Sequence, residues 1–373
     1  MLRSLAEVID SYDPNLPLAN ASTIPAAWYV DPRLLELERQ TVFARSWQVV
    51  GRADQLRTPG DFVTFELPGG EPVVVVRGDD GVLRGFFNVC RHHAAAVATE
   101  PHGSARMLRC PYHGWTYSLD GALKGTPDFT GVCDFDRATH GLLPIEVGVW
   151  EHWVFASIER TGLSLEEYLG ADLVRRVERL DIRTLRWMER RHYTVDCNWK
   201  VFVDNYLDGG YHVPHLHKGL GSVLDYSAYT IENGDRFCLQ SSPMVREGAE
   251  ERTGAVRAGE RASYFWVYPN LMINCYAAAM DINLVIPRGV NRTEVIFDYF
   301  FADLSDAARD RNLASIAVSE QIQDEDVGIC ASVQRGLTSR AYTAGRLSAR
   351  REAGEHLFHR LLHADLVRGL PRT

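Results

Sequence analysis

The sequence predicts an α+β protein with two folded parts: a small all-β domain, then a domain in which helices flank an antiparallel sheet. Two observations lead to this prediction. Between residues 46 and 158, short apolar runs are separated by Gly and Pro turns, which is typical of strands. Beyond residue 160, strand-like runs are joined to segments of helical periodicity, the longest at 305–337. We expect a helical segment at 1–44 that packs on the last domain, and domains at 45–160 and 161–373.

Composition narrows the possible partners. The chain has 373 residues, 46% of them hydrophobic, and a net charge of −9, which argues against nucleic acid as a partner. Apolar runs are too short for a membrane span, and the first residues lack a signal-peptide core. Seven widely spread cysteines, an odd number, predict a reduced, cytoplasmic protein without membrane attachment.

The individual elements follow from local periodicity. Apolar residues at helical spacing predict a helix over 32–45, and a capping-box pattern at Ser164–Glu167 begins another that runs past Val177. Strands are predicted in the first domain at 46–51, 61–67, 72–77, 83–89, 107–109, 115–118 and 150–158. In the second domain they are predicted at 263–268, 271–276, 281–286 and 293–301.

A first metal constellation lies in the β domain. Cys90 and His92 form a Cys-x-His pair, and Cys110 and His113 form a Cys-x2-His pair 17 residues later. Each pair follows a strand and enters a turn, where a hairpin loop directs two side chains inward. Two thiolates with two imidazoles suit either a tetrahedral zinc ion or a Rieske cluster. His93 follows His92 directly, so on an extended chain it points the other way and is expected to be structural.

A second constellation lies in residues 198–217, where three histidines and two aspartates stand among aromatic residues. Imidazoles and a carboxylate are the ligands of 2-His-1-carboxylate iron sites, but a helix end with a polar face is the alternative. On an ideal helix His212 shares a face with His215 and not with His217. Pro214 breaks the helix beyond His212 and lets the chain turn back. Periodicity alone leaves the second histidine open.

A carboxylate on the long predicted helix completes the set. Asp326 falls on the apolar face, and an unpaired carboxylate there is expensive. Glu325 and Asp324 are expected to face elsewhere. The apolar positions that share the face of Asp326 are Ile322, Ile329, Cys330 and Val333.

The loop Cys110-Pro111-Tyr112-His113-Gly114 resembles the second cluster loop of the Rieske-type ring-hydroxylating and amine-oxidising oxygenases. The resemblance implies a Rieske [2Fe–2S] domain followed by a helix-grip-like catalytic domain with mononuclear Fe(II) that uses O2. It makes Cys90, His92, Cys110 and His113 the cluster ligands. The family's His-x4-His motif matches His212 and His217 and so favours His217 over His215. The family also has an iron-binding acid eight residues before a Gln, and Asp326 and Gln334 match this pair.

The resemblance also implies an electron path. Asp208 lies four residues before His212, where its carboxylate can accept the ring N–H. In the family this acid bridges to a cluster histidine of a neighbouring subunit in a homotrimer, which here is His113. Many members have the acid three residues before the histidine, where this chain has Gly209, so Asp204 is a rival, and Asn205 is a further catalytic candidate. Electrons are expected from a separate NAD(P)H-dependent flavin and iron–sulfur reductase or a ferredoxin, because the chain has no flavin or nicotinamide fingerprint.

The resemblance is closest to the choline monooxygenases, over nearly the whole chain, and implies monooxygenation of choline or a related quaternary amine. Such a cation needs an aromatic cage with few charged contacts. Three alanines at 277–279 replace a bulkier stretch, which suggests a larger amine or an aromatic substrate. The alternatives are an aromatic-ring hydroxylating or O/N-demethylating oxygenase, and a Rieske electron-transfer protein without oxygenase activity. Candidate cage residues are Trp199, Phe202, Tyr206 and Tyr276, with Tyr211 and Trp266 as further possibilities.

Overall fold

The computed structural model describes residues 3–159, 162–245, 247–257 and 259–370. The chain divides into two compact units, Phe43–Tyr168 and a second one that joins Met1–Val42 to Leu169–Thr373. The first 42 residues therefore belong with the C-terminal part of the chain. Both units contain antiparallel sheets, and the predicted α+β class is confirmed. Among the helices of the described residues, none has the length and apolar character that a membrane crossing requires.

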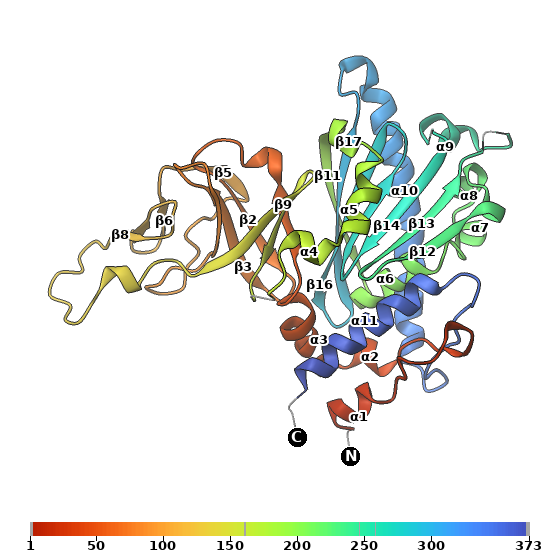
Figure 1. Cartoon of the computed structure of the whole chain (residues 1–373), viewed down its shortest axis with the longest axis horizontal. Helices are drawn as coiled ribbons and strands as arrows, with labels where there is room; N and C mark the ends of the chain where they lie inside the picture. The colour runs from red at the N-terminus through yellow and green to blue at the C-terminus, as the bar shows by residue number, and fades with distance from the viewer. Residues whose placement is uncertain (1–2, 160–161, 246, 258, 371–373) are drawn as a thin grey trace. The chain divides into compact units, whose positions relative to one another are not determined.

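The unit Phe43–Tyr168 is built on a seven-stranded antiparallel sheet and a three-stranded one (Figure 1). The order in the large sheet is β1-β10-β9-β4-β3-β2-β5, and the small sheet has the order β6-β7-β8. The strands of the large sheet are β1 (Gln48–Arg52), β2 (Asp61–Leu67), β3 (Glu71–Arg77), β4 (Leu83–Phe87), β5 (His102–Ser104), β9 (Pro144–Trp150) and β10 (Trp153–Ser157). Those of the small sheet are β6 (Leu108–Arg109), β7 (Thr116–Tyr117) and β8 (Leu123–Gly125).

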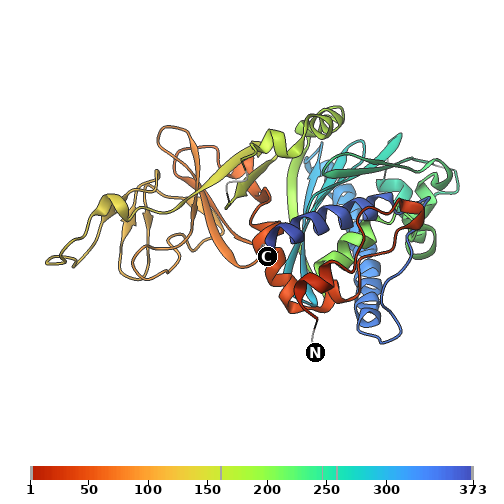
Figure 2. The same ribbon diagram turned by 60° about the horizontal axis from the view of Figure 1, so that its bottom comes forward.

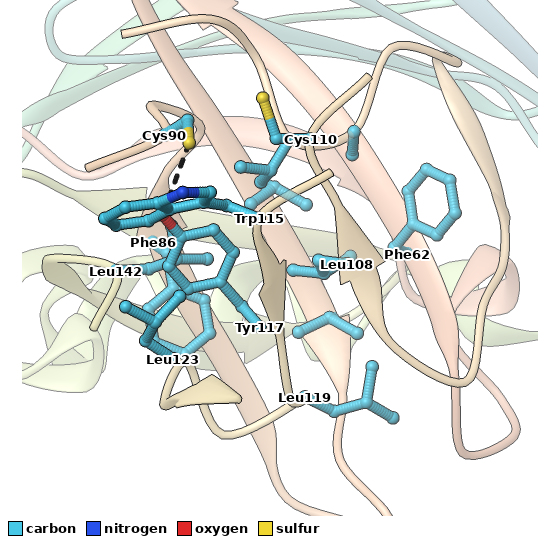
Figure 3. Packing of buried hydrophobic residues seen from close by; sticks show 14 residues of the cluster. Phe62, Phe86, Cys90, Leu108, Cys110, Trp115, Tyr117, Leu119, Leu123 and Leu142 are labelled. Carbon is cyan, nitrogen blue, oxygen red and sulfur yellow. Dashed lines mark hydrogen bonds between the residues drawn. The ribbon is translucent and has the colours of Figure 1, made fainter. Parts of the chain in front are cut away.

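Strand β3 separates two hydrophobic clusters in this unit. Its four consecutive valines are fully buried because alternate side chains enter opposite clusters. Val74 and Val76 join the cluster that includes Cys90 and Cys110, while Val73 and Val75 join the other. Figure 3 shows the two cysteines at one end of their cluster, beside Trp115 and Tyr117. The apolar core therefore fixes the two loops in which these cysteines lie.

The second unit contains a seven-stranded antiparallel sheet with the order β11-β17-β16-β15-β14-β13-β12. Helix α6 (Trp199–Leu207) packs against this sheet and against the helices α10 (Asp306–Leu337) and α11 (Ala353–Gly369) (Figures 1 and 2). The strands are β11 (Arg186–Val195), β12 (Thr230–Asn233), β13 (Phe237–Pro243), β14 (Arg261–Val267), β15 (Leu271–Cys275), β16 (Ala279–Gly289) and β17 (Arg292–Phe301). The other helices are α1 (Leu5–Ile9), α2 (Ala27–Val30), α3 (Pro32–Glu38), α5 (Ala171–Glu178), α7 (Val213–Leu216), α8 (Lys218–Val223) and α9 (Glu251–Val256).

Several elements differ from the sequence prediction. The helix expected from residue 164 is two helices, α4 (Leu165–Leu169) and α5, because Gly170 between them has a φ of +78°. The helix expected over 32–45 ends as α3 at Glu38 and continues as a π-helical turn, Arg39–Phe43. Six strands were not predicted. In the second unit these are β11, at one edge of the sheet, and β12 and β13, at the other edge, where partly polar residues obscure the alternation. In the first unit they are β5, β8 and β9.

Helix α6 is anchored at its N-terminus by buried polar contacts. The Asn198 side chain accepts from the backbone N–H of Lys200, and the Asn198 backbone N–H donates to Gln334 Oε1 at 2.8 Å. Lys200 Nζ lies 2.5 Å from Glu38 Oε1, and Trp199 Nε1 donates to Glu38 Oε2 at 2.7 Å. Both members of this ion pair are fully buried. These contacts fix the helix against α3 and α10.

Candidate metal centres and substrate cavity

The chain reverses direction between α6 and α7 at two glycines, Gly209 and Gly210, with φ of +70° and +68°. A Cβ at Gly209 would lie 2.1 Å from the Arg351 carbonyl oxygen, so no other residue fits there. An acid three residues before His212 is therefore excluded at this position. Pro214 does not break a helix as predicted. It stands in the first turn of α7, where proline is favoured, so the break lies before His212.

Helix α7 places His212 at its N-cap and His217 at its C-cap. The two rings meet edge to face with centroids 4.8 Å apart. His215 is exposed on the same short helix and takes no part in this contact. The one-turn helix therefore brings together the two histidines that a continuous helix would have separated.

Asp326 on α10 joins the two histidines. Its Oδ1 lies 3.1 Å from His217 Nε2 and 4.0 Å from His212 Nε2. Asn205 Nδ2 donates to the same Oδ1 at 2.8 Å, so α6 holds this carboxylate in place. The apolar face predicted around Asp326 is only partly buried, because Ile329 and Val333 are exposed.

A carboxylate also contacts the far side of each ring. His212 Nδ1 donates to Asp208 Oδ2 at 2.6 Å, and His217 Nδ1 donates to Glu325 Oε2 at 2.6 Å. Each contact holds the proton of a neutral ring on Nδ1, which leaves Nε2 beside Asp326 as the atom that can bind a metal. Glu325 was expected to face away from the site, and this expectation is wrong. Asp208 is the C-cap of α6, so its contact with His212 spans the glycine turn and not a helical face.

The donor set fits a divalent transition metal such as iron. The three donor atoms of His212, His217 and Asp326 lie within 4.8 Å of one another, and two imidazoles with one carboxylate form a facial triad. Burial opposes the charged form of His217, but Asp326 and Glu325 outweigh it and raise its pKa. Negative charge is thus in excess around the rings, which favours a bound cation.

The loops of the other unit bring two thiols and two imidazoles together. Cys90 and Cys110 are buried, and the ring centroids of His92 and His113 lie 4.7 Å apart. The Tyr117 hydroxyl lies 3.4 Å from Cys90 Sγ and accepts from the Arg91 backbone N–H at 3.0 Å. Gly114 has a φ of +73°, which lets the second loop turn beside Arg109 and Pro127.

These four side chains fit a two-iron cluster better than a single ion. His92 Nδ1 is buried and has no hydrogen-bond partner among the residues that the structure describes, as expected of an atom that binds a metal. Among the described residues, the groups with three donors within 4.8 Å do not include this set, so its donors do not converge on one point. His93 does not point away as predicted. A turn closed by the Ala94 N–H and the Cys90 carbonyl places its ring 5.3 Å from that of His113.

A cavity of about 110 Å³ opens on the three-residue group of α7 and α10. Six aromatic side chains line it among polar and aliphatic ones, and a buried cation and a buried carboxylate also reach it. The aromatic residues that line it are Phe202, Tyr206, Tyr229, Tyr264, Tyr276 and Phe297, and the charged ones besides Asp326 are Arg257 and Asp281.

The comparisons with known proteins cover nearly the whole chain. Residues 46–136 match the family model of the Rieske [2Fe-2S] domain, and residues 182–366 match the ring hydroxylating alpha subunit (catalytic domain). The chain is 40% identical to choline monooxygenase of Arabidopsis thaliana, with 97% of this chain and 87% of that protein covered. The chain belongs to the Rieske-type non-heme iron oxygenases.

Other relatives agree with this assignment. The carnitine monooxygenase oxygenase subunit of Escherichia coli K12 is 30% identical, with 88% of each chain covered. A quaternary ammonium Rieske monooxygenase solved with L-carnitine superposes with a TM-score of 0.81 at 27% identity and covers 99% of this chain and 100% of that one. This oxygenase subunit therefore uses a Rieske [2Fe–2S] cluster, a mononuclear iron and O2, and it needs a separate reductase or ferredoxin. The zinc and electron-carrier alternatives do not hold.

The cage candidates divide into two groups. Phe202, Tyr206 and Tyr276 line the cavity. Trp199 does not, and its prediction is wrong: it is fully buried against Phe358 and donates to Glu38. Trp266 is likewise buried against Phe358, and Tyr211 is exposed.

The three alanines at 277–279 do not line the cavity either, and Ala277 lies beside Gly259. They therefore do not enlarge the cavity, contrary to expectation. The cage was also expected to have few charged contacts, yet Arg257 and Asp281 reach it. Asp281 had a sequence signal, a carboxylate within an apolar strand, whereas Arg257 had none.

Asp204 lies away from the histidine pair. Its carboxylate accepts from the Tyr29 hydroxyl at 2.6 Å and lies 3.0 Å from His359 Nε2. Both Asp204 and Asp208 line a second cavity of about 200 Å³, but only Asp208 contacts His212. This contact favours Asp208 over its rival.

Proposed function

We propose that this chain is the terminal oxygenase that inserts oxygen from O2 into a quaternary amine such as choline, with electrons from a separate reductase or ferredoxin. The observation that supports this most directly is the aromatic cavity that ends on His212, His217 and Asp326. The choline and carnitine monooxygenases among its relatives act on amines of this class, as their names state.

The metal sites are assigned as follows. His212, His217 and Asp326 hold the mononuclear iron, and Cys90, His92, Cys110 and His113 hold the cluster. When bound, these groups supply O2 activation and electron transfer. The protein's own residues orient the donors: Asn205 and Glu325 fix Asp326 and His217, and Asp208 fixes His212.

Substrate binding falls to the aromatic wall. Phe202, Tyr206 and Tyr276 line the cavity and are the candidates for cation–π contact with a cationic ammonium group, which lacks N–H donors. Tyr206 is held by its hydroxyl, which donates to Asn274 Oδ1 at 2.8 Å. The rings thus form a rigid surface that excludes water from the reacting C–H bond.

The electron path is proposed to enter through Asp208 from His113 of a neighbouring subunit in a homotrimer. The contact of Asp208 with His212 supports this, as do the exposed apolar side chains of Ile329 and Val333 on α10. The expected cytoplasmic location stays a prediction from the sequence, and the plant relatives are chloroplastic by name.

An oxygen-uptake screen with product identification tests the substrate class. Choline, carnitine, glycine betaine and simple aryl ethers are each supplied with a reductase shown to reduce the cluster. Coupled uptake with at least one quaternary amine and an oxidised product is expected, with three irons and two sulfides per chain. Coupled uptake with aryl ethers alone would exclude the quaternary amines and indicate the demethylating alternative.

A further inference from the structure

A second group of potential metal ligands lies at the cavity of about 200 Å³ that Asp204 and Asp208 line. Asp204 comes from α6, while Glu355 and His359 stand about one turn apart on α11, so their side chains share a face. One donor atom from each of these three residues lies within 4.8 Å of the other two. Two carboxylates and an imidazole therefore converge at a place outside the site assigned to mononuclear iron.

The distances in this group resemble those of the iron site. His359 Nε2 lies 3.0 Å from Asp204 Oδ1, and His217 Nε2 lies 3.1 Å from Asp326 Oδ1. Two donors that bind one ion at about 2.1 Å and at a right angle to each other are about 3.0 Å apart. The third donor, Glu355 Oε1, lies 3.8 Å from His359 Nε2. These separations suit three ligands around a single ion.

Glu355 is the side chain that points to a missing ligand. It is 5% exposed and lines the cavity, and its contact with His359, at 3.8 Å, is too long for a hydrogen bond. Its carboxylate accepts no hydrogen bond within the part of the chain that the structure describes. A proton shared by Asp204 and His359 would satisfy that pair and still leave Glu355 without a donor. A buried carboxylate in this position is unfavourable, and a cation bound beside it would remove the cost.

The surroundings of Glu355 contain an excess of negative charge. Burial raises the pKa of Glu355 well above its usual range, and the charges of Asp204, Glu352 and Asp208 raise it further. Among the described residues, no lysine or arginine forms an ion pair with any of these four carboxylates. A cation in the cavity would offset this excess.

We propose that Asp204, Glu355 and His359 form a second metal site, which binds a divalent first-row transition metal. The imidazole favours such an ion over Mg²⁺ and Ca²⁺, which prefer oxygen ligands alone. The cavity has room for water molecules as the remaining ligands. The ion joins α6 to α11 and places positive charge in the cavity that Asp208 also lines. This site does not depend on which substrate the aromatic cavity binds.

Manganese(II) is the probe that tests this site in the intact, iron-loaded protein. Mn²⁺ has the lowest affinity in the order of the first-row divalent metals, so it does not displace iron from the other sites. The protein is titrated with Mn²⁺, and free Mn²⁺ is measured by its EPR signal at room temperature. Iron per chain is determined before and after the titration, and an excess of Mg²⁺ is then added as a competitor.

Four variants separate a ligand from a nearby charge. Glu355→Gln and Asp204→Asn each remove one proposed ligand and keep the shape of the side chain. Glu352→Gln is the matched control, because Glu352 contributes to the same excess of charge but is not one of the three donors. Asp326→Ala removes a ligand of the iron site and leaves the proposed site intact.

We expect the wild-type protein to bind one Mn²⁺ per chain, with no loss of iron and no displacement by Mg²⁺. Glu355→Gln and Asp204→Asn should each weaken Mn²⁺ binding by about 100-fold or more, because loss of even an outer-shell partner typically costs about 10- to 100-fold. Glu352→Gln should weaken it by less than about tenfold, and Asp326→Ala should still bind Mn²⁺. Mn²⁺ should raise the melting temperature of the wild type but not that of Glu355→Gln. Visible absorbance of the cluster and the melting temperature without Mn²⁺ show that each variant is folded.

Four outcomes would overturn the proposed site. The first is a wild-type protein that binds no Mn²⁺. The second is binding that Asp326→Ala abolishes and Glu355→Gln retains, which would place the ion in the iron site. The third is equal weakening by Glu352→Gln and Glu355→Gln, which would show that charge alone attracts the ion. The fourth is displacement by Mg²⁺, which would exclude the imidazole of His359 as a ligand.

Discussion

Glu325→Gln should weaken the hold on mononuclear iron without affecting the cluster. The carboxylate of Glu325 accepts from His217 Nδ1 at 2.6 Å and so fixes the ring with Nε2 toward Asp326. Glutamine keeps the shape and one acceptor oxygen but removes the negative charge. That charge makes the imidazole a stronger electron-pair donor to the metal. Loss of such a partner typically costs about 10- to 100-fold in metal affinity.

The structure places this effect at the lower end of that range. The Glu325 side chain is 29% exposed, so solvent screens part of its charge, and His217 itself is only 1% exposed. Packing therefore retains much of the ring's orientation when the carboxylate is lost. We expect about a tenfold loss of iron affinity, equivalent to about 1.4 kcal/mol.

Anaerobic equilibrium dialysis against an iron(II) buffer measures this directly, with iron per chain as the readout and cluster absorbance as the internal reference. Asp324→Asn is the matched control, because it removes a carboxylate from the adjacent, exposed position of α10. Iron retention equal to that of the wild type in Glu325→Gln would refute the reasoning and show that packing alone orients His217.

Three further predictions concern the other buried charges. Asp326→Ala should lose mononuclear iron and keep the cluster's colour, since Asp326 lies in the other unit, so a colourless variant would contradict the assignment of the two sites. Asp208→Ala should keep both metals and stop electron transfer between them. Rapid-mixing absorbance should then show slow reoxidation of the reduced cluster by O2 in the presence of substrate. An unchanged rate would exclude Asp208 as the bridge. Lys200→Met should destabilise the protein by about 3–5 kcal/mol because it leaves Glu38 buried and unpaired. Adding Glu38→Leu should recover most of the melting temperature, and a negligible loss in the single variant would show that Glu38 is neutral.

Local periodicity was sufficient to place most of the main elements, but the choice of His217 over His215 as the second histidine came from the resemblance to the family's His-x4-His motif. The strands β2, β14 and β17 begin and end within about two residues of prediction, because their alternation is undisturbed. His212, His217 and Asp326 converge as expected. The reason for their convergence was not foreseen, since the break lies at Gly209–Gly210 and Pro214 begins the next helix.

Tertiary contacts account for the errors. On a helical wheel Glu325 and Asp326 are about 100° apart, so the wheel predicts that they face different neighbours. His217 instead lies between them and contacts one with each ring nitrogen. Trp199 was taken for a cage residue because aromatic residues near metal ligands suggest a pocket. Its neighbour Lys200 needs a buried counter-ion, however, and Glu38 of α3 supplies it from 162 positions away in the chain. Glu38 also accepts the hydrogen bond of the Trp199 indole.

Helix α6 lies between two cavities that differ in composition. Phe202 and Tyr206 face the aromatic cavity, while Asp204 and Asp208 face the acidic one, and Asn205 reaches both. The contact of Asp208 with His212 is where the acidic side meets the histidine pair. Substrate and electrons would therefore approach the iron ligands from opposite sides of one helix, so a bound amine need not block the path of the electrons. This arrangement depends on a fixed α6, which gives a functional reason for anchoring its first turn with a fully buried ion pair.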